Sequence, residues 1–169
     1  MNYSYASKEI KNYEGSLIAK NEKNDCFVRA MAAATNLDYD TTHNFVKENF
    51  NRKEKKGTQN GEIISAMKKF EREGLTIGDK KFEVEVLQKP LLTNSYKLHG
   101  KVVNRKKTVK SFIKSLPNGT FVVLVSKHAF VVKDGVLIDN KGEEFRPTRK
   151  VLAAYAIDSK DIYKQLSLF

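Results

Sequence analysis

Three residues of the types that support nucleophilic catalysis occur in the order cysteine, histidine, aspartate: Cys26, His128 and Asp139. Cys26 is the only cysteine of the chain and lies at the predicted start of a helix. The dipole of that helix and a neighbouring imidazolium both favour the nucleophilic thiolate form. His128 would act as general base and then as general acid, and Asp139 would fix its orientation and tautomer. These residues predict the centre of a thiol hydrolase.

A thiol hydrolase also stabilises the oxyanion that forms when the thiolate attacks a carbonyl carbon. The backbone N–H of Cys26 at the helix start would supply one donor. A second donor is usually a side chain just upstream of the nucleophile, where Asn21 and Asn24 are the candidates. Cys26 and His128 also have a structural alternative. A cysteine on an apolar helix is often a buried core residue, and a histidine in a strand often has no catalytic role. For His43 and His99 we expect surface positions.

The elements that would position these residues follow from the hydrophobic pattern. Helical spacing predicts a helix from Asn24 or Asp25 to about Asn36. A second helix should begin at Asp38 or Asp40, and a third should end at Gly74. The first twenty or so residues show no period and are predicted to be a loosely structured lead-in.

The second half of the chain has the pattern of strands. Alternation predicts a strand at 82–86, a basic connection and a short helix capped by Thr108. Apolar runs at 120–126, 128–133, 136–140 and 151–157 predict further strands. Helices followed by strands indicate an α+β fold with an antiparallel sheet. We expect one domain at 1–158 and a tail at 159–169.

The Asp134-Gly135 pair predicts a two-residue hairpin turn between the strands at 128–133 and 136–140. In that register Phe130 lies opposite Asp139. His128 is two residues from Phe130 and therefore shares its face, so Asp139 becomes the diagonal neighbour of His128. Asn140 should face the other side of the sheet. The register therefore selects Asp139 as the residue that orients the imidazole.

Several of these segments resemble the small papain-like proteins common in bacteriophage genomes. The resemblance covers about 24–140 and is carried by residues 24–32 (NDCFVRAMA), 57–58 (GT), 119–120 (GT) and 128–139 (HAFVVKDGVLID). It implies a papain-like fold and a Cys-His-Asp triad made by Cys26, His128 and Asp139. The family usually has an oxyanion glutamine about six residues before the nucleophile, and this chain has Lys20 there.

Positive charge is concentrated in one segment of a chain whose net charge is +11. No Asp or Glu occurs from Val86 to Lys133, a stretch that carries ten Lys and Arg residues. The segment is either a surface for nucleic acid or an acidic protein partner, or a solvated face. Its candidate contact residues are Lys97, Lys101, Arg105, Lys106, Lys107, Lys110 and Lys114.

The last five residues resemble the short peptide with which bacterial replication proteins dock onto the ring-shaped DNA sliding clamp. They are Gln165, Leu166, Ser167, Leu168 and Phe169. The resemblance implies a bacterial sliding clamp as partner. The alternative is a tail that packs on its own domain.

A single cysteine cannot form an internal disulfide, and with three histidines the sequence offers no metal-ligand cluster. No apolar run is long enough to span a membrane. We expect a cytoplasmic protein, in the bacterial host if it is phage-encoded, with no membrane contact, metal or cofactor. Two functions follow. The first is a thiol hydrolase that cleaves a peptide, isopeptide or amide bond. The second is a non-catalytic clamp-binding protein on a papain-like scaffold, which the missing oxyanion glutamine favours.

Overall fold

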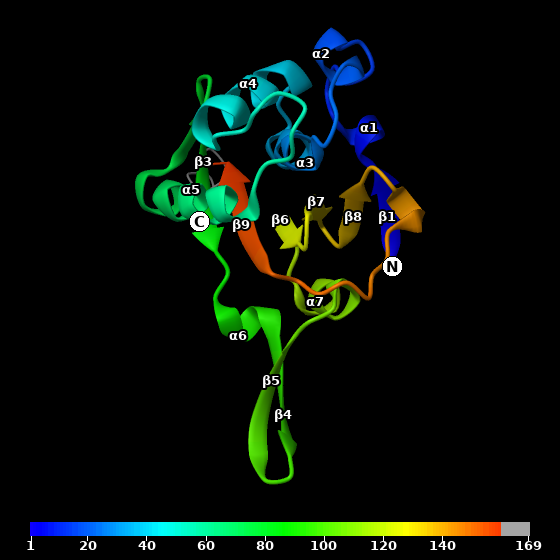
Figure 1. The fold of residues 1–169 in the computed structure, drawn as a ribbon, viewed down its shortest axis with the longest axis vertical. Coiled ribbons are helices and arrows are strands. Elements are labelled where there is room, and N and C mark those ends of the chain that lie inside the picture. Colours follow the sequence, from blue (N-terminus) through cyan, green and yellow to red (C-terminus); the bar gives the residue numbers. More distant parts are fainter. Residues whose placement is uncertain (160–169) are drawn as a thin grey trace, which may run out of the picture.

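Seven strands form one sheet in the computed structural model, which describes residues 1–159 (Figure 1). The strand order is β1-β8-β7-β6-β9-β3-β2. The strands are β1 (Asn2–Tyr5), β2 (Leu75–Ile77), β3 (Lys80–Val86), β6 (Thr120–Val125), β7 (His128–Lys133), β8 (Val136–Asp139) and β9 (Ala153–Ser159). Residues 165–169, the predicted clamp-binding peptide, lie outside the described residues.

The central strands β6 and β7 are buried on both faces. Their side chains point alternately to the two faces, and consecutive residues are buried. On β6, Val122 and Leu124 join one apolar core while Phe121, Val123 and Val125 join the other. The near-continuous apolar run of this strand is the pattern expected of a strand covered on both sides.

Helices cover both faces of this sheet (Figure 1). The first core packs against the three long helices and the second against α7. The helices are α1 (Ala6–Glu9), α2 (Leu17–Lys20), α3 (Cys26–Thr35), α4 (Tyr39–Asn49), α5 (Asn60–Glu73), α6 (Lys89–Leu92) and α7 (Val109–Ser115), with a 3-10 turn η1 (Gly142–Glu144).

The predicted helices are confirmed, and three of their ends have the expected chemistry. The side chain of Asp38 caps α4 by accepting from the N–H of Thr41, and Thr108 caps α7 by accepting from Ser111. Helix α5 stops at Gly74, whose φ of 84° favours glycine. Helix α3 begins at Cys26, next to the predicted start at Asn24 or Asp25.

The predicted hairpin register is also confirmed. Strand β7 pairs antiparallel with β8, with Val131 opposite Ile138 and Val132 opposite Leu137. Asp134 and Gly135 both have positive φ, as a two-residue turn of the hairpin type requires.

The prediction of an antiparallel sheet is wrong at one edge, so the sheet is mixed. Strand β1 pairs parallel to β8, with Tyr5 in register with Asp139. The residues expected to be a loose lead-in thus form β1, α1 and α2. Four residues are too few to show a period, and their partner strand is remote in the chain. Gly142 lies against β1 so closely that a Cβ there would approach the ring of Tyr5 to 2.7 Å.

The basic connection after β3 contains structure that the sequence pattern did not predict. Helix α6 leads into β4 (Thr93–Leu98), which pairs antiparallel with β5 (Lys101–Lys106) in a separate two-stranded sheet. His99 and Gly100 form its turn with positive φ. The hairpin projects from the rest of the molecule (Figure 1).

Candidate active site

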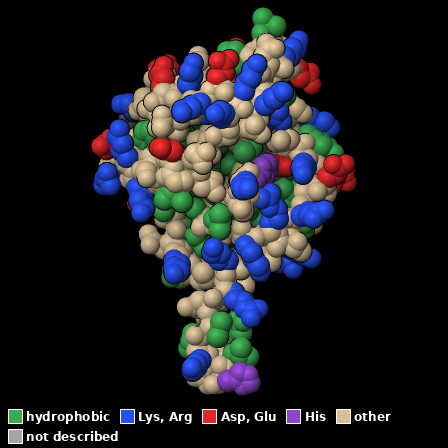
Figure 2. All heavy atoms as spheres, in the orientation of Figure 1, with side chains coloured by type: hydrophobic (Ala, Val, Ile, Leu, Met, Phe, Trp, Pro, Cys, Tyr) green, Lys and Arg blue, Asp and Glu red, His purple; other side chains and the backbone are tan. Residues whose placement is uncertain are grey.

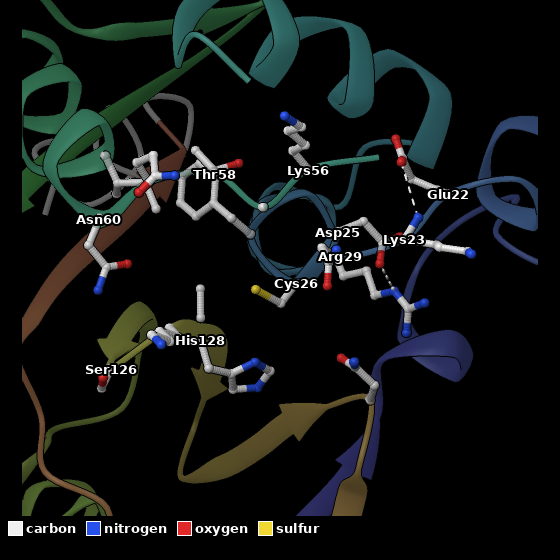
Figure 3. A pocket seen from close by; sticks show the side chains of 18 residues that line it. Glu22, Lys23, Asp25, Cys26, Arg29, Lys56, Thr58, Asn60, Ser126 and His128 are labelled. Carbon is white, nitrogen blue, oxygen red and sulfur yellow. Dashed lines mark hydrogen bonds and ion pairs between the residues drawn. The ribbon is translucent and has the colours of Figure 1, made fainter. Parts of the chain in front are cut away.

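The thiol of Cys26 lies at the first residue of α3, where the helix end meets the start of β7. The side chain is half-buried, and its sulfur lies on the side of the helix that faces His128 (Figure 3). Four N–H groups at the start of a helix have no partner within the helix, so this position favours negative charge.

His128 and Asp139 are in direct contact. Nε2 of His128 lies 2.5 Å from Oδ1 of Asp139, and the second carboxylate oxygen accepts a 2.9 Å hydrogen bond from the N–H of Lys141. The carboxylate is buried, with 1% of its side chain exposed, and the imidazole is 15% exposed. The pair thus combines a carboxylate shielded from water with a ring that reaches the cavity beside Cys26.

Burial lowers the pKa of His128, but hydrogen bonds to Asp139 and to Cys26 outweigh this effect and raise it to about 9. Burial raises the pKa of Asp139, but the hydrogen bond and the charge of His128 outweigh burial and hold the pKa of this carboxyl below its ordinary value. At neutral pH the histidine is therefore an imidazolium held between a carboxylate and the sulfur.

The sheet explains why Asp139 and not its neighbour orients His128. His128 lies on the face of β7 that carries Phe130, and Asp139 on the matching face of β8. The prediction that Asn140 points away is wrong. Strand β8 ends at Asp139, so alternation no longer applies to Asn140, which is exposed and lines the cavity.

The start of α3 is not capped by a side chain. Asp25 occupies the capping position, but its carboxylate pairs with Nε of Arg29 at 3.0 Å and bonds no N–H of the first turn. The first-turn N–H groups next to the Cys26 sulfur are consequently left for a ligand. The backbone N–H of Cys26, the expected oxyanion donor, is one of these groups.

The two candidate oxyanion side chains lie in different places. Asn24 lines the cavity, and its Nδ2 donates a 3.3 Å hydrogen bond to the carbonyl of Lys55. Asn21 is not among the residues that line the cavity, and its Nδ2 donates to the carbonyl of Leu17. The structure therefore brings Asn24 but not Asn21 to the site.

A cavity of about 730 Å³ opens at the Cys26 thiol (Figure 3). Its walls are the start of α3, the loop before α5, the β6–β7 turn and the end of β8. Sequence reasoning missed the wall made by Thr58, Gln59 and Asn60. Nδ2 of Asn60 donates a 3.2 Å hydrogen bond to the carbonyl of Val125, which ties the start of α5 to the β6–β7 turn.

A buried ionic cluster supports the chain just before Cys26. The carboxylate of Glu22 accepts from Arg52 at 2.7 Å and lies 2.5 Å from Nε2 of His43. Burial raises the pKa of Glu22, but the hydrogen bonds from Arg52 and His43 outweigh it and lower the pKa to about 2. The guanidinium of Arg52 also donates to the carbonyl of Lys23. The cluster joins residues 22–23 to the loop that forms the opposite wall.

The prediction that His43 is a surface residue is therefore wrong, whereas His99 is exposed as expected. His43 falls on the same stripe of α4 as Tyr39 and Val46, both buried. This helical spacing could have predicted from the sequence that His43 is buried.

Comparisons with protein-family models, curated proteins and solved structures found no match to this chain. The assignment below depends on the residues and their geometry. Within residues 1–159, no group of three His, Cys, Asp or Glu side chains is placed to hold a metal ion. No helix in that range has both the length and the apolar character needed to cross a membrane.

Proposed function

We propose that the protein is a papain-like thiol hydrolase that cleaves a peptide, isopeptide or amide bond, with Cys26 as nucleophile. The observation that carries this proposal is that a thiol and an imidazole line the same cavity while a buried carboxylate bonds the imidazole from behind. The thiol comes from α3, and the imidazole and carboxylate come from β7 and β8, which follow much later in the chain. In space the imidazole lies between the thiol and the carboxylate, as a base between a nucleophile and an orienting group should.

In the first half of the reaction, the thiolate of Cys26 attacks the carbonyl carbon of the scissile bond. The carbonyl oxygen becomes an oxyanion, which accepts hydrogen bonds from the first-turn N–H groups of α3. The imidazolium of His128 gives its proton to the leaving nitrogen, the C–N bond breaks and the amine departs. A thioester between Cys26 and the acyl group remains.

In the second half, neutral His128 takes a proton from water, whose oxygen attacks the thioester carbonyl. The C–S bond breaks, the carboxylic acid is released and the thiolate returns beside the imidazolium. Asp139 keeps Nε2 of His128 engaged throughout, so the other ring nitrogen is free to face the sulfur.

The charges around the cavity favour an acidic substrate. Glu22 and Asp25 line the cavity, but their carboxylates are neutralised by Arg52 and Arg29. The exposed rim residues Lys23, Lys56 and Lys127 form no ion pair among the described residues. The net potential is positive, so carboxylate side chains flanking the scissile bond should strengthen binding.

The proposal is tested by acyl transfer to Cys26 from a nitrophenyl ester. We expect a burst of nitrophenolate equal to the protein concentration, a Cys26-linked acyl group by mass spectrometry, and slow turnover afterwards. Cys26→Ala should remove the burst and the adduct. The matched control is Ser126→Ala, which changes an exposed hydroxyl of the same cavity and should leave both intact. Equal labelling of the wild type and Cys26→Ala would overturn the proposal.

A second function is supported by the C-terminal peptide 165–169, whose five residues resemble a sliding-clamp-binding motif. We propose that this peptide delivers the domain to the bacterial replication machinery, or that clamp occupancy is itself the activity. Lys20 stands where the family has its oxyanion glutamine, and this departure favours the non-catalytic version. Clamp binding and its biological effect should then survive Cys26→Ala.

A further inference from the structure

The β4–β5 hairpin forms an arm whose side chains contribute little to either core. Ten of the twelve strand residues are exposed, including Tyr96, Leu98 and Val102. At its base, the N–H of Lys107 donates a 2.8 Å hydrogen bond to the carbonyl of Leu92. A lone hairpin is at best marginally stable in water, so a projecting one with exposed side chains indicates a surface for a partner.

Cross-strand pairing divides the arm into two faces, because directly paired residues project on the same side. The contact between Arg105 and the ring of Tyr96 and the hydrogen bond between Ser95 and Asn104 agree with this division. The apolar face carries Asn94, Tyr96, Leu98, Lys101, Val103 and Arg105. The polar face carries Thr93, Ser95, Lys97, Val102, Asn104 and Lys106.

The charge of the arm has a single sign. Both faces carry two cations, and no Asp or Glu occurs anywhere in the arm or in α7. Figure 2 shows basic and apolar side chains on the visible side of the arm and no acidic ones. Exposed Lys110 and Lys114 extend the positive charge from the base of the arm onto α7. Such a surface attracts a polyanion.

The shape of the arm selects among polyanions. A two-stranded ribbon fits the major groove of B-form DNA, which is about 12 Å wide. The major groove of A-form RNA is too narrow for side chains to read. Six residues at about 3.3 Å each give the ribbon a length of about 20 Å, enough to follow the groove over several base pairs.

We propose that the β4–β5 arm binds duplex DNA by laying its polar face in the major groove. Lys97 and Lys106 lie near opposite ends of this face and pair with phosphates along the groove walls. Ser95 and Asn104 lie between them and face the base edges. The apolar face, where Arg105 covers Tyr96, points away from the groove. This DNA-binding function is independent of the proposed hydrolase activity.

The test compares two double variants of equal charge by fluorescence anisotropy with a labelled 20-base-pair duplex. Lys97→Gln with Lys106→Gln should weaken binding about tenfold at 50 mM salt and reduce the log-log salt slope by about 1.8, for two lost phosphate contacts. Lys68→Gln with Lys69→Gln removes two exposed lysines of α5 instead, and should change the affinity less than twofold. Circular dichroism checks that each variant is folded.

Two further measurements make the proposal specific. Double-stranded RNA of the same length should bind at least tenfold more weakly than DNA. The double variant Tyr96→Ser with Leu98→Ser, on the apolar face, should keep DNA affinity. Equal losses in the two lysine variants, equal binding of RNA, or loss of binding only in the apolar-face variant would overturn the proposal; the last result would place the opposite face, with Lys101 and Arg105, against the DNA.

Discussion

The hydroxyl of Tyr39 donates a 2.7 Å hydrogen bond to Oδ2 of Asp25, the residue immediately before Cys26. Burial and the nearby Asp25 carboxylate raise the pKa of Tyr39 well above its ordinary value, so the hydroxyl remains a donor. An aspartate at this position would normally cap the helix through its own side chain. Tyr39 and Arg29 hold the carboxylate elsewhere, and the N–H groups beside the thiol stay open.

Tyr39→Phe should therefore affect both stability and catalysis. The buried carboxylate loses a donor, which costs about 1–3 kcal/mol of unfolding free energy in urea denaturation. Freed from Tyr39, Asp25 can accept from the first-turn N–H groups, so acylation of Cys26 should slow. Tyr13→Phe is the matched control, since Tyr13 packs against Tyr39 but makes no hydrogen bond to Asp25 in the described structure. Unchanged acylation in Tyr39→Phe would contradict the role assigned to the helix end.

The reaction should lose rate as the pH rises through about 9, because acylation needs the proton of the His128 imidazolium. Asp139→Asn removes a contact that raises this pKa, so the alkaline limb should move to lower pH. The rate should also fall by about 10²–10⁴. Asn140→Ala, beside Asp139, should leave the limb in place. A pH–rate profile of nitroaniline release from an anilide substrate, whose amine leaving group needs that proton, measures both effects, and an unmoved limb in Asp139→Asn would refute the pairing.

The same histidine makes stability depend on pH. The pKa of His128 is about 9 in the fold against 6.5 for an ordinary histidine, so folding favours the protonated form. Its stabilising contribution is complete below pH 6.5 and disappears as the pH rises through about 9. Urea denaturation at a series of pH values should show this loss in the wild type. The loss should be absent in His128→Gln, and its persistence there would assign it to another group.

Glu22→Gln should destabilise the fold strongly. The side chains of Glu22 and Arg52 are 3% and 1% exposed, so removing the carboxylate leaves a buried guanidinium without its counter-charge. The expected cost is about 3–5 kcal/mol. Glu54→Gln, an exposed residue of the neighbouring loop, should change stability by less than about 0.5 kcal/mol. Similar values for the two variants would show that the cluster contributes little.

Removing Leu168 and Phe169 should abolish binding to a purified bacterial sliding clamp, because these residues are two of the three apolar anchors of the peptide. Ordering an extended peptide costs entropy, so we expect a micromolar Kd from the peptide alone, with tighter binding if the folded domain also contacts the ring. Acylation of Cys26 should be unaffected by the truncation. A polymerase-derived clamp peptide should displace the intact protein. No binding at about 100 μM protein would refute the docking proposal.

The parts of the site that depend on local rules could be predicted from the sequence. The position of Cys26 follows from helix periodicity, and the pairing of His128 with Asp139 follows from a two-residue turn that fixes the register. The Glu22 cluster could not be predicted, since it joins side chains from three segments that lie far apart in the chain. Strand β1 could not be predicted for a similar reason. It pairs with β8, which is far away in the chain, and a hydrophobic pattern reports only on residues that are close in sequence.

The parallel pairing of β1 with β8 joins a strand to a partner that is synthesised long after it. Tyr5 is synthesised long before its partner Asp139 and before Gly142, the glycine that packs against its ring. Helix α3, which carries Cys26, is likewise made before β7 and β8, which carry His128 and Asp139. A nascent chain therefore carries Cys26 before it carries His128, and the proposed hydrolytic activity begins only after β7 and β8 have been made and β1 has paired with β8.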